Sequence, residues 1–171
     1  MTARRASSIV VMGVSGCGKS TVALALAQRL GMAFIEGDEL HPPRNVALMA
    51  AGTPLTDADR QGWLQAIASR LAGAQDRGAV VACSALKRRY RDQLRASAPG
   101  LRFVHLSGAP SVLAQRLAAR SGHYMPPSLL QSQLDTLEPP GADEHALVLN
   151  IETPPPQIVD AVCRQLEIAP A

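Results

Sequence analysis

Short apolar stretches alternate with segments of helical periodicity along this chain. The apolar stretches are rich in β-branched residues and bounded by turn-forming residues, as expected for buried strands, and they occupy residues 8–12, 33–36, 79–83, 101–106 and 146–151. Helical patterns fall at residues 21–30, 45–51, 57–71, 87–97, 111–120, 128–137 and 156–166. This alternation predicts βαβ units, and therefore an α/β fold with a mainly parallel sheet in one domain spanning residues 1–171.

The first predicted strand is followed by the sequence Gly-Val-Ser-Gly-Cys-Gly-Lys-Ser, which fits the phosphate-binding P-loop pattern. A strand before it and a helix after it would aim backbone N–H groups and the positive end of a helix dipole at a phosphate. Lys19 adds a charge for the β- and γ-phosphates, and Ser20 offers a hydroxyl to Mg²⁺. The alternative, an ordinary glycine turn, is disfavoured by these flanks. The predicted nucleotide-binding residues are Gly13, Val14, Ser15, Gly16, Cys17, Gly18, Lys19, Ser20 and Thr21.

Composition narrows the class of protein. A hydrophobic content of 47% with 18% charged residues is typical of a globular domain, and 3% aromatic residues argues against a base-stacking nucleic-acid platform. The net charge of +3 suits small anionic ligands, although a solvated basic helix face is the common alternative. The three cysteines form neither a metal-spaced pair nor an even disulfide set, and no export signal or membrane-spanning run is visible. We therefore expect a cytoplasmic protein that binds neither membrane nor nucleic acid.

Other features separate the classes of P-loop protein. The chain has no Asn-Lys-x-Asp segment for reading guanine, and its third predicted strand ends in Cys83-Ser84, without the aspartate of a Walker-B strand. The length leaves little room for a mechanical or nucleic-acid module beside a nucleotide core. These observations favour a small kinase in which the second strand supplies the carboxylates.

Asp38 is the strongest candidate for the base that accepts the proton of the attacking hydroxyl. It follows the second predicted strand at the sheet edge that carries the P-loop, where open α/β sheets bind ligands. A helix N-cap is the alternative role for this aspartate. Glu36, two residues earlier and on the same side of the pleat, could hold a Mg²⁺-bound water, or be a plain acid at the end of a strand.

A lid is predicted at about residues 116–137. Arg116 and Arg120 share a helix face, and the Gly and Pro residues that follow could act as hinges. Arginine makes rigid bidentate contacts with phosphate, so both residues are candidates for binding ATP. Arg120 is also a candidate catalytic residue for phosphoryl transfer. A solvated helix end followed by an ordinary turn is the alternative. His123 is a candidate substrate-binding residue, with ordering of the lid as the alternative role.

Several motifs together resemble the small bacterial-type gluconokinases, over residues 10–151. They are the P-loop, Glu36-Gly-Asp-Glu-Leu-His-Pro42, Asn45, Met49, Gly52, Pro54-Leu-Thr-Asp57, Asp59-Arg60, Trp63-Leu64, Cys83-Ser-Ala-Leu-Lys87, Tyr90-Arg-Asp92, Arg120-x-Gly-His123 and Gln133-x-x-Thr-Leu-Glu138. The resemblance implies ATP-dependent phosphorylation of D-gluconate at its 6-hydroxyl. It also implies a three-layer P-loop kinase fold like that of shikimate and nucleoside monophosphate kinases. That fold has a five-stranded parallel sheet, helices on both faces and a mobile lid, and a homodimer is implied as well.

The resemblance also implies roles for individual residues. Lys19 and Ser20 would serve the phosphates and Mg²⁺, Asp38 would face the substrate hydroxyl, and the lid arginines would act on ATP. The sugar-acid pocket would be lined by His41, Arg44, Lys87 and Arg91. A carboxylate could sit between Arg44 and Lys87, since they follow two strands at one edge; a solvated loop arginine and a first-turn lysine are the alternatives. Trp63 is expected to be a packing anchor.

Three other functions remain open from the sequence. Another small-acceptor kinase of the same architecture would act on shikimate or on a nucleoside monophosphate. A nucleic-acid-dependent ATPase would use the basic helix at residues 87–97, and its affinity would fall steeply with salt. A catalytically silent nucleotide sensor would bind ATP without needing Asp38.

Overall fold

The computed structural model describes residues 6–120 and 126–167, which form a five-stranded parallel sheet with the order β2-β3-β1-β4-β5. The strands are β1 (Ile9–Met12), β2 (Ala33–Glu36), β3 (Ala79–Ala82), β4 (Arg102–Ser107) and β5 (Leu147–Asn150). The predicted number and direction of strands are confirmed. β1 lies at the centre of the sheet, so the loop that follows it emerges in the middle of the carboxyl edge.

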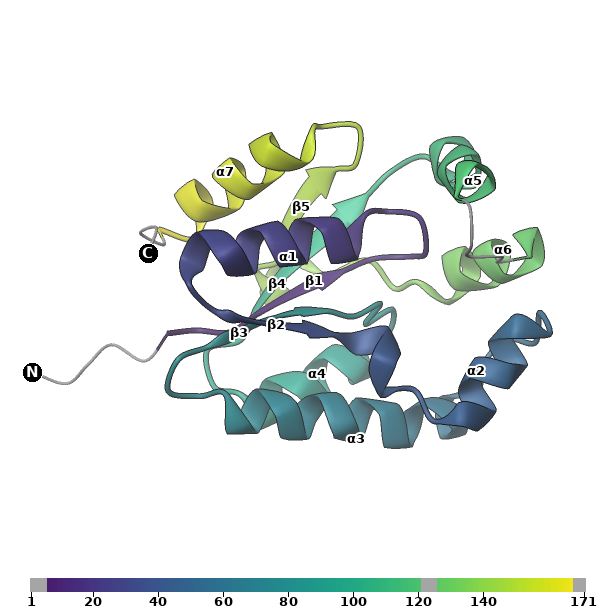
Figure 1. The fold of residues 1–171 in the computed structure, drawn as a ribbon, viewed down its shortest axis with the longest axis horizontal. Helices are drawn as coiled ribbons and strands as arrows, with labels where there is room; N and C mark the ends of the chain where they lie inside the picture. The colour runs from purple at the N-terminus through teal and green to yellow at the C-terminus, as the bar shows by residue number, and fades with distance from the viewer. Residues whose placement is uncertain (1–5, 121–125, 168–171) are drawn as a thin grey trace, which may run out of the picture.

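Helices cover both faces of the sheet (Figure 1). α1 (Lys19–Leu30) and α7 (Pro155–Gln165) pack on one face, and α3 (Asp57–Gly73) and α4 (Arg88–Ser97) pack on the other. The remaining helices, α2 (Pro43–Ala50), α5 (Pro110–Ala119) and α6 (Pro127–Thr136), gather at the carboxyl ends of the strands. This is the three-layer arrangement predicted for the fold.

The alternation of side chains along β1 explains the two layers of core. Ile9 and Val11 point to the layer shared with α1 and α7, whereas Val10 and Met12 point to the layer shared with α3 and α4. All four side chains are fully buried. A strand covered on both faces reads as a continuous apolar run, which is why this strand was predictable from the sequence.

Helix ends follow local chemistry. α3 begins after Thr56 with a capping box, in which Thr56 Oγ1 accepts from Asp59 N and Asp59 Oδ2 accepts from Thr56 N. α2 begins at Pro43, two residues earlier than predicted, because proline is well tolerated in the first turn of a helix.

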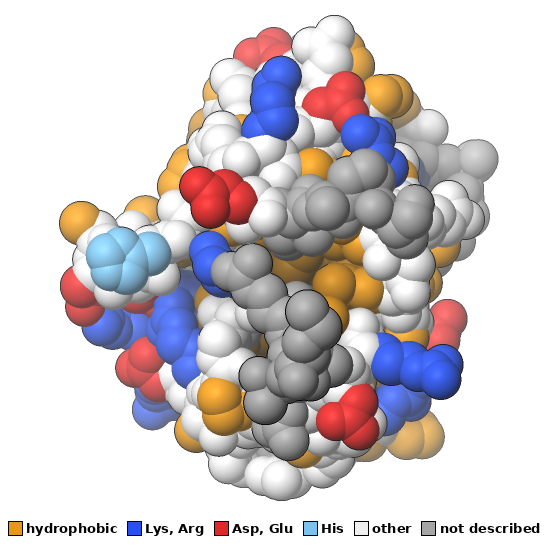
Figure 2. Space-filling model, turned by 90° about the vertical axis from the view of Figure 1, so that its left-hand side faces the viewer, with side chains coloured by type: hydrophobic (Ala, Val, Ile, Leu, Met, Phe, Trp, Pro, Cys, Tyr) orange, Lys and Arg blue, Asp and Glu red, His pale blue; other side chains and the backbone are white. Residues whose placement is uncertain are grey.

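Figure 2 views the molecule from the end opposite α2 and α6. Figure 2 shows acidic and basic side chains interspersed over the described surface of this end. In the described part of the chain, every helix is too short or too polar to span a bilayer.

Candidate functional site

The P-loop connects β1 to α1 in a tight turn. Its glycines Gly13, Gly16 and Gly18 have φ values of 146°, 84° and 90°, which L side chains rarely adopt. The loop therefore brings the backbone around to the N-terminus of α1, where unpaired N–H groups and the helix dipole favour an anion. Lys19 Nζ donates to the Val14 carbonyl at 3.1 Å and lies 4.0 Å from Cys17 Sγ. The lysine thus folds back over the loop, on the side where phosphates bind.

Asp38 is held in place by the residue before it. A Cβ on Gly37 would overlap the Ala82 carbonyl oxygen, so only glycine allows β2 to turn this close to β3. Trp63 Nε1 donates to the Gly37 carbonyl at 2.7 Å and fixes the same peptide. This short 3₁₀ turn, Gly37–Leu40, presents Asp38 to a pocket that Lys19 also lines.

Two expectations about these acids need correction. Asp38 lies inside a 3₁₀ turn, so it neither caps α2, whose N-cap is Pro42, nor continues the pleat of Glu36. Glu36 is the last residue of β2 and lies outside the lining of the pocket. The two carboxylates therefore have different surroundings, and Asp38 is the one that faces the pocket.

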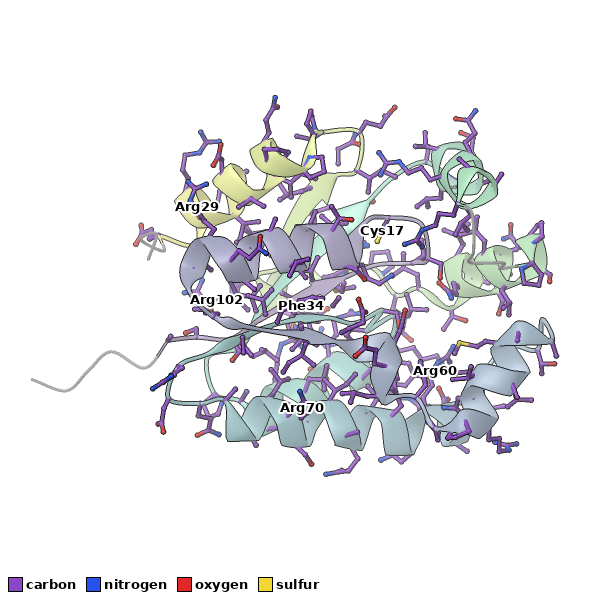
Figure 3. The ribbon with its side chains drawn as sticks, in the orientation of Figure 1. Cys17, Arg29, Phe34, Arg60, Arg70 and Arg102 are labelled. Atoms are coloured by element: carbon purple, nitrogen blue, oxygen red, sulfur yellow. The ribbon has the colours of Figure 1, made fainter. Side chains whose placement is uncertain are left out.

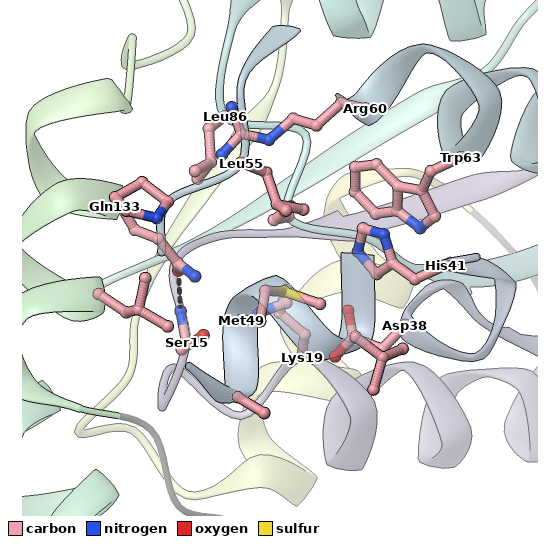
Figure 4. A pocket seen from close by; sticks show the side chains of 15 residues that line it. Ser15, Lys19, Asp38, His41, Met49, Leu55, Arg60, Trp63, Leu86 and Gln133 are labelled. Atoms are coloured by element: carbon pink, nitrogen blue, oxygen red, sulfur yellow. Dashed lines mark hydrogen bonds between the residues drawn. The ribbon is translucent and has the colours of Figure 1, made fainter. Parts of the chain in front are cut away.

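The pocket has a volume of about 340 Å³ and lies between the P-loop, the turn after β2, and helices α2, α3 and α6 (Figure 4). The lining residues with polar groups are Ser15, Lys19, Asp38, His41, Arg60, Trp63, Ser84 and Gln133. The apolar lining residues are Val46, Met49, Ala50, Pro54, Leu55, Leu86 and Leu129. A concave site with a few convergent polar groups is the usual form of a small-molecule site.

His41 presents a defined neutral ring to this pocket. The ring stacks on Trp63, with centroids 4.3 Å apart and planes 11° apart. Burial lowers the pKa of His41, so the ring is neutral at pH 7. The Asn45 amide nitrogen lies 3.2 Å from His41 Nδ1 and can only donate, so Nδ1 accepts and Nε2 carries the proton. His41 therefore offers the pocket an N–H donor.

Arg44 and Lys87 do not line the pocket, contrary to the sequence-based prediction. Lys87 Nζ donates to Asp57 at 3.0 Å, and Arg44 donates to Asp59 with its side chain 71% exposed. Hydrogen bonds from Tyr90, Arg89 and Lys87 hold the pKa of the Asp57 carboxyl far below its usual range. Hydrogen bonds from Thr56 and Arg44 lower the pKa of Asp59 to about 2. Each cation already has a carboxylate partner at the outer surface.

Arg60 is the cation that sequence reasoning missed. It lines the pocket from α3, and its Nη1 donates to the Tyr90 hydroxyl at 3.2 Å. Figure 3 shows Arg60 and Cys17 at the end of the molecule that carries α2 and α6. A signal was present in the sequence, because Arg60 precedes Trp63 by three residues and so shares its helix face.

Arg91 is not a pocket residue, and that prediction is wrong. Its side chain is fully buried, and its five N–H groups are taken by acceptors in the protein. Nε and Nη2 pair with Glu144 at 2.7 and 2.9 Å, and the remaining donors bind the carbonyls of Ala85, Leu86 and Glu138. Arg91 therefore holds together the loop after β3 and the chain after α6.

The predicted lid begins on α5 and ends on α6. Arg116 Nη2 donates to the Ile151 carbonyl at 2.6 Å, and Arg120 is the exposed C-cap of α5. Neither arginine lines the pocket, so their action on ATP stays a prediction. His123 lies outside the described residues. α6 packs Leu129 and Leu130 into the interior, which fixes the C-terminal part of the predicted lid.

Comparisons with known proteins agree with this geometry. Residues 9–140 match a family model described as AAA domain. The chain is 50% identical to the gluconokinase of Gluconobacter oxydans over 93% of this chain and 90% of that one. A crystal structure of a gluconokinase from Sinorhizobium meliloti aligns with a TM-score of 0.84 and 50% identity, covering 96% of this chain and 98% of the other.

A more distant structure bears on the fold alone. Shikimate kinase from Bacteroides thetaiotaomicron aligns with a TM-score of 0.70 at 18% identity, covering 95% of this chain and 99% of that one. The predicted likeness to the shikimate kinase fold is therefore confirmed. The 50% identical relatives and the matching family model show that the chain belongs to the gluconokinase family of P-loop kinases.

Proposed function

We propose that this protein transfers the γ-phosphoryl group of ATP to the 6-hydroxyl of D-gluconate, forming 6-phospho-D-gluconate and ADP. The observation that carries this proposal is that Lys19, from the P-loop, and Asp38 line one pocket. Phosphoryl transfer needs a phosphate-binding loop and a carboxylate that orients the attacking hydroxyl, both facing one cavity. The 40–50% identical gluconokinases support gluconate as the acceptor.

Few protein groups take part in the phosphoryl transfer, and each has its own role. The P-loop N–H groups, the N-terminus of α1 and Lys19 bind the phosphates and neutralise charge as it develops. Asp38 orients the 6-hydroxyl and accepts its proton while the oxygen–phosphorus bond forms and the bond to ADP breaks. Mg²⁺ usually keeps most of its waters. The Ser20 hydroxyl would be its protein ligand, Glu36 and Asp38 would hold it through water, and the bound ion would neutralise phosphate charge.

The acceptor site follows from the remaining polar groups. Among the described residues that line the pocket, Lys19 and Arg60 are the two with a permanently charged cationic side chain. Lys19 serves phosphate, so Arg60 is the cation for the gluconate carboxylate. His41 would donate through Nε2 to a hydroxyl of the chain. We extend the proposal to Arg116, Arg120 and His123 acting from the lid, which rests on the residue pattern and the resemblance. A cytoplasmic location rests on the sequence, and a homodimer rests on the resemblance alone.

An ADP-release assay over a panel of acceptors tests this function. We expect turnover with D-gluconate that exceeds turnover with shikimate, nucleoside monophosphates and other sugar acids. Turnover with shikimate but not with gluconate would contradict the proposal. Turnover stimulated by RNA or DNA in the absence of gluconate would favour a nucleic-acid-dependent ATPase instead.

Replacing Arg60 tests the carboxylate site. We expect Arg60→Gln to raise KM for gluconate about 10- to 100-fold, since hydrogen bonds to charged groups are worth roughly 1.5–3 kcal/mol. KM for ATP should stay within about twofold. The matched control is Arg44→Gln, because Arg44 is exposed and pairs with Asp59 outside the pocket. A larger effect at Arg44 than at Arg60 would return the carboxylate to the site predicted from the sequence.

A further inference from the structure

α6 contacts the P-loop through one hydrogen bond that the proposed roles do not use. The backbone N–H of Ser15 donates to Gln133 Oε1 at 2.8 Å, across 118 residues of sequence. Both residues line the pocket together with Lys19 and Asp38. Gln133 thus reaches the acceptor site from α6, whereas His41 follows the 3₁₀ turn after β2 and Arg60 lies on α3.

This bond fixes the orientation of the Gln133 amide. A backbone N–H can only donate, so the amide oxygen must face Ser15 and the amide nitrogen must point away from it. Figure 4 shows the amide at the wall of the pocket, with the dashed bond to Ser15 and the remaining end of the amide toward the interior. The pocket therefore receives an oriented NH₂ group with two donors.

The helix beneath Gln133 is anchored. Leu130 is buried in the core layer, and Leu134 and Leu137 pack against the same layer. Immediately after α6, Glu138 N donates to the Leu86 carbonyl at 2.8 Å. A polar group on a well-packed helix positions a ligand more accurately than one on a loop.

Gln133 shares its part of the pocket with apolar and polar side chains. Leu86 lies near Gln133, Ser15 is bonded to it, and Asp38 and His41 lie across the pocket (Figure 4). Leu129, from the same helix α6, also lines the pocket. A linear polyol carries hydroxyls along its whole length, and a hydroxyl buried against an apolar wall would lack a partner. The Gln133 amide nitrogen is an oriented donor for a hydroxyl that lies against Leu86.

We propose that Gln133 is a specificity-determining residue of the acceptor site, whose amide nitrogen donates to one hydroxyl on the carbon chain of the polyol. Its oxygen, held by Ser15, ties the acceptor to the same loop that binds ATP. This inference rests on the proposed function. It adds a contact from α6 that sets the position of the acceptor relative to the P-loop.

The test measures KM of the wild-type enzyme and of the Gln133→Met variant for gluconate and for four analogues. Each analogue lacks one of the hydroxyls at C2 to C5, so every pair of enzyme and acceptor completes a double-mutant cycle. We expect KM for gluconate to rise about 3- to 10-fold in the variant, as for loss of one neutral hydrogen bond. For one analogue, the wild-type enzyme and the variant should have equal KM, because the contact is already missing. ATP affinity should stay within about twofold.

Two further variants keep the result interpretable. Gln133→Glu retains an oxygen for Ser15 but lacks the donor, so it should show the same pattern among the analogues if Gln133→Met fails to fold. Gln131→Met is the matched control, because Gln131 is exposed on α6 and bonds only Asp135 among the described contacts. It should leave both KM values within about twofold of wild type.

The outcomes separate this inference from the proposed function. If the wild-type enzyme does not phosphorylate gluconate, both are overturned. If wild type is active and the Gln133 variants change KM equally for gluconate and all four analogues, the inference alone is overturned. A loss of ATP affinity without any change in KM for the acceptors would also overturn it, because Gln133 would then act only on the P-loop.

Discussion

The Asp38→Asn enzyme is expected to lose about 10²- to 10⁴-fold in kcat for gluconate phosphorylation, which is the usual contribution of a general base. Asparagine has nearly the same shape and can still accept a hydrogen bond from the 6-hydroxyl, but it cannot take the proton. The turn that carries this side chain should remain, since Gly37 and Trp63 fix it through the backbone. Steady-state kinetics with saturating gluconate measure the effect.

The control for this substitution is Glu39→Gln. Glu39 is an exposed acid in the same 3₁₀ turn and lies outside the lining of the pocket, so its kcat should stay within about twofold of wild type. Calorimetric titration should show that Asp38→Asn still binds ATP, because the P-loop is untouched. An Asp38→Asn enzyme with kcat within tenfold of wild type would remove Asp38 from the chemistry and would favour a nucleotide sensor.

The fold and the nucleotide side of the site could be predicted because their signals are local. Buried parallel strands appear as short β-branched runs, and the P-loop needs glycines at positions with positive φ. Asp38 was found for a similar reason, since it directly follows a strand at the carboxyl edge of the sheet. Each of these inferences uses residues that are neighbours in sequence.

The residues that bind the acceptor could not be predicted in the same way. Whether a lysine or arginine faces the pocket depends on whether it forms an ion pair with a carboxylate elsewhere in the fold. Lys87 pairs with Asp57, thirty positions away, and Arg91 pairs with Glu144, 53 positions away. The position of Arg60 three residues before Trp63 is a local signal for Arg60, but no local pattern shows that Lys87 and Arg91 are paired away from the pocket. The sequence placed basic residues at the correct edge, but their partners are set by tertiary contacts between α3, α4 and the 3₁₀ turn Ala142–Glu144.

The Glu144→Gln substitution is expected to lower the free energy of unfolding by about 3–5 kcal/mol, the range found when one partner of a buried ion pair is removed. The side chains of Arg91 and Glu144 are 0% and 1% exposed, so the guanidinium would stay buried without a counter-charge. Urea titration followed by circular dichroism measures the change. The control is Asp143→Asn, whose pair with Arg88 is exposed to solvent, so its loss should leave the free energy of unfolding nearly unchanged.

The pH dependence of stability gives an independent measurement of the same pair. Hydrogen bonds from Arg91 lower the pKa of Glu144 from 4.5 to about 2, so the folded state favours the charged form. The stabilisation is complete above pH 4.5 and is lost as the pH falls toward 2, because the unfolded chain takes up its proton first. Glu144→Gln should therefore lose less stability than wild type over this window. Equal losses would show that Glu144 does not hold the Arg91 charge.

The Glu144 substitution should also reach the acceptor site, because Arg91 binds the carbonyls of Ala85 and Leu86. Ala85 has a φ of 45°, a conformation that a non-glycine residue keeps only when its surroundings hold it, and Leu86 lines the pocket. We therefore expect a folded Glu144→Gln enzyme to have a raised KM for gluconate with KM for ATP nearly unchanged. An unchanged KM for gluconate would mean that the loop after β3 keeps its shape without the ion pair.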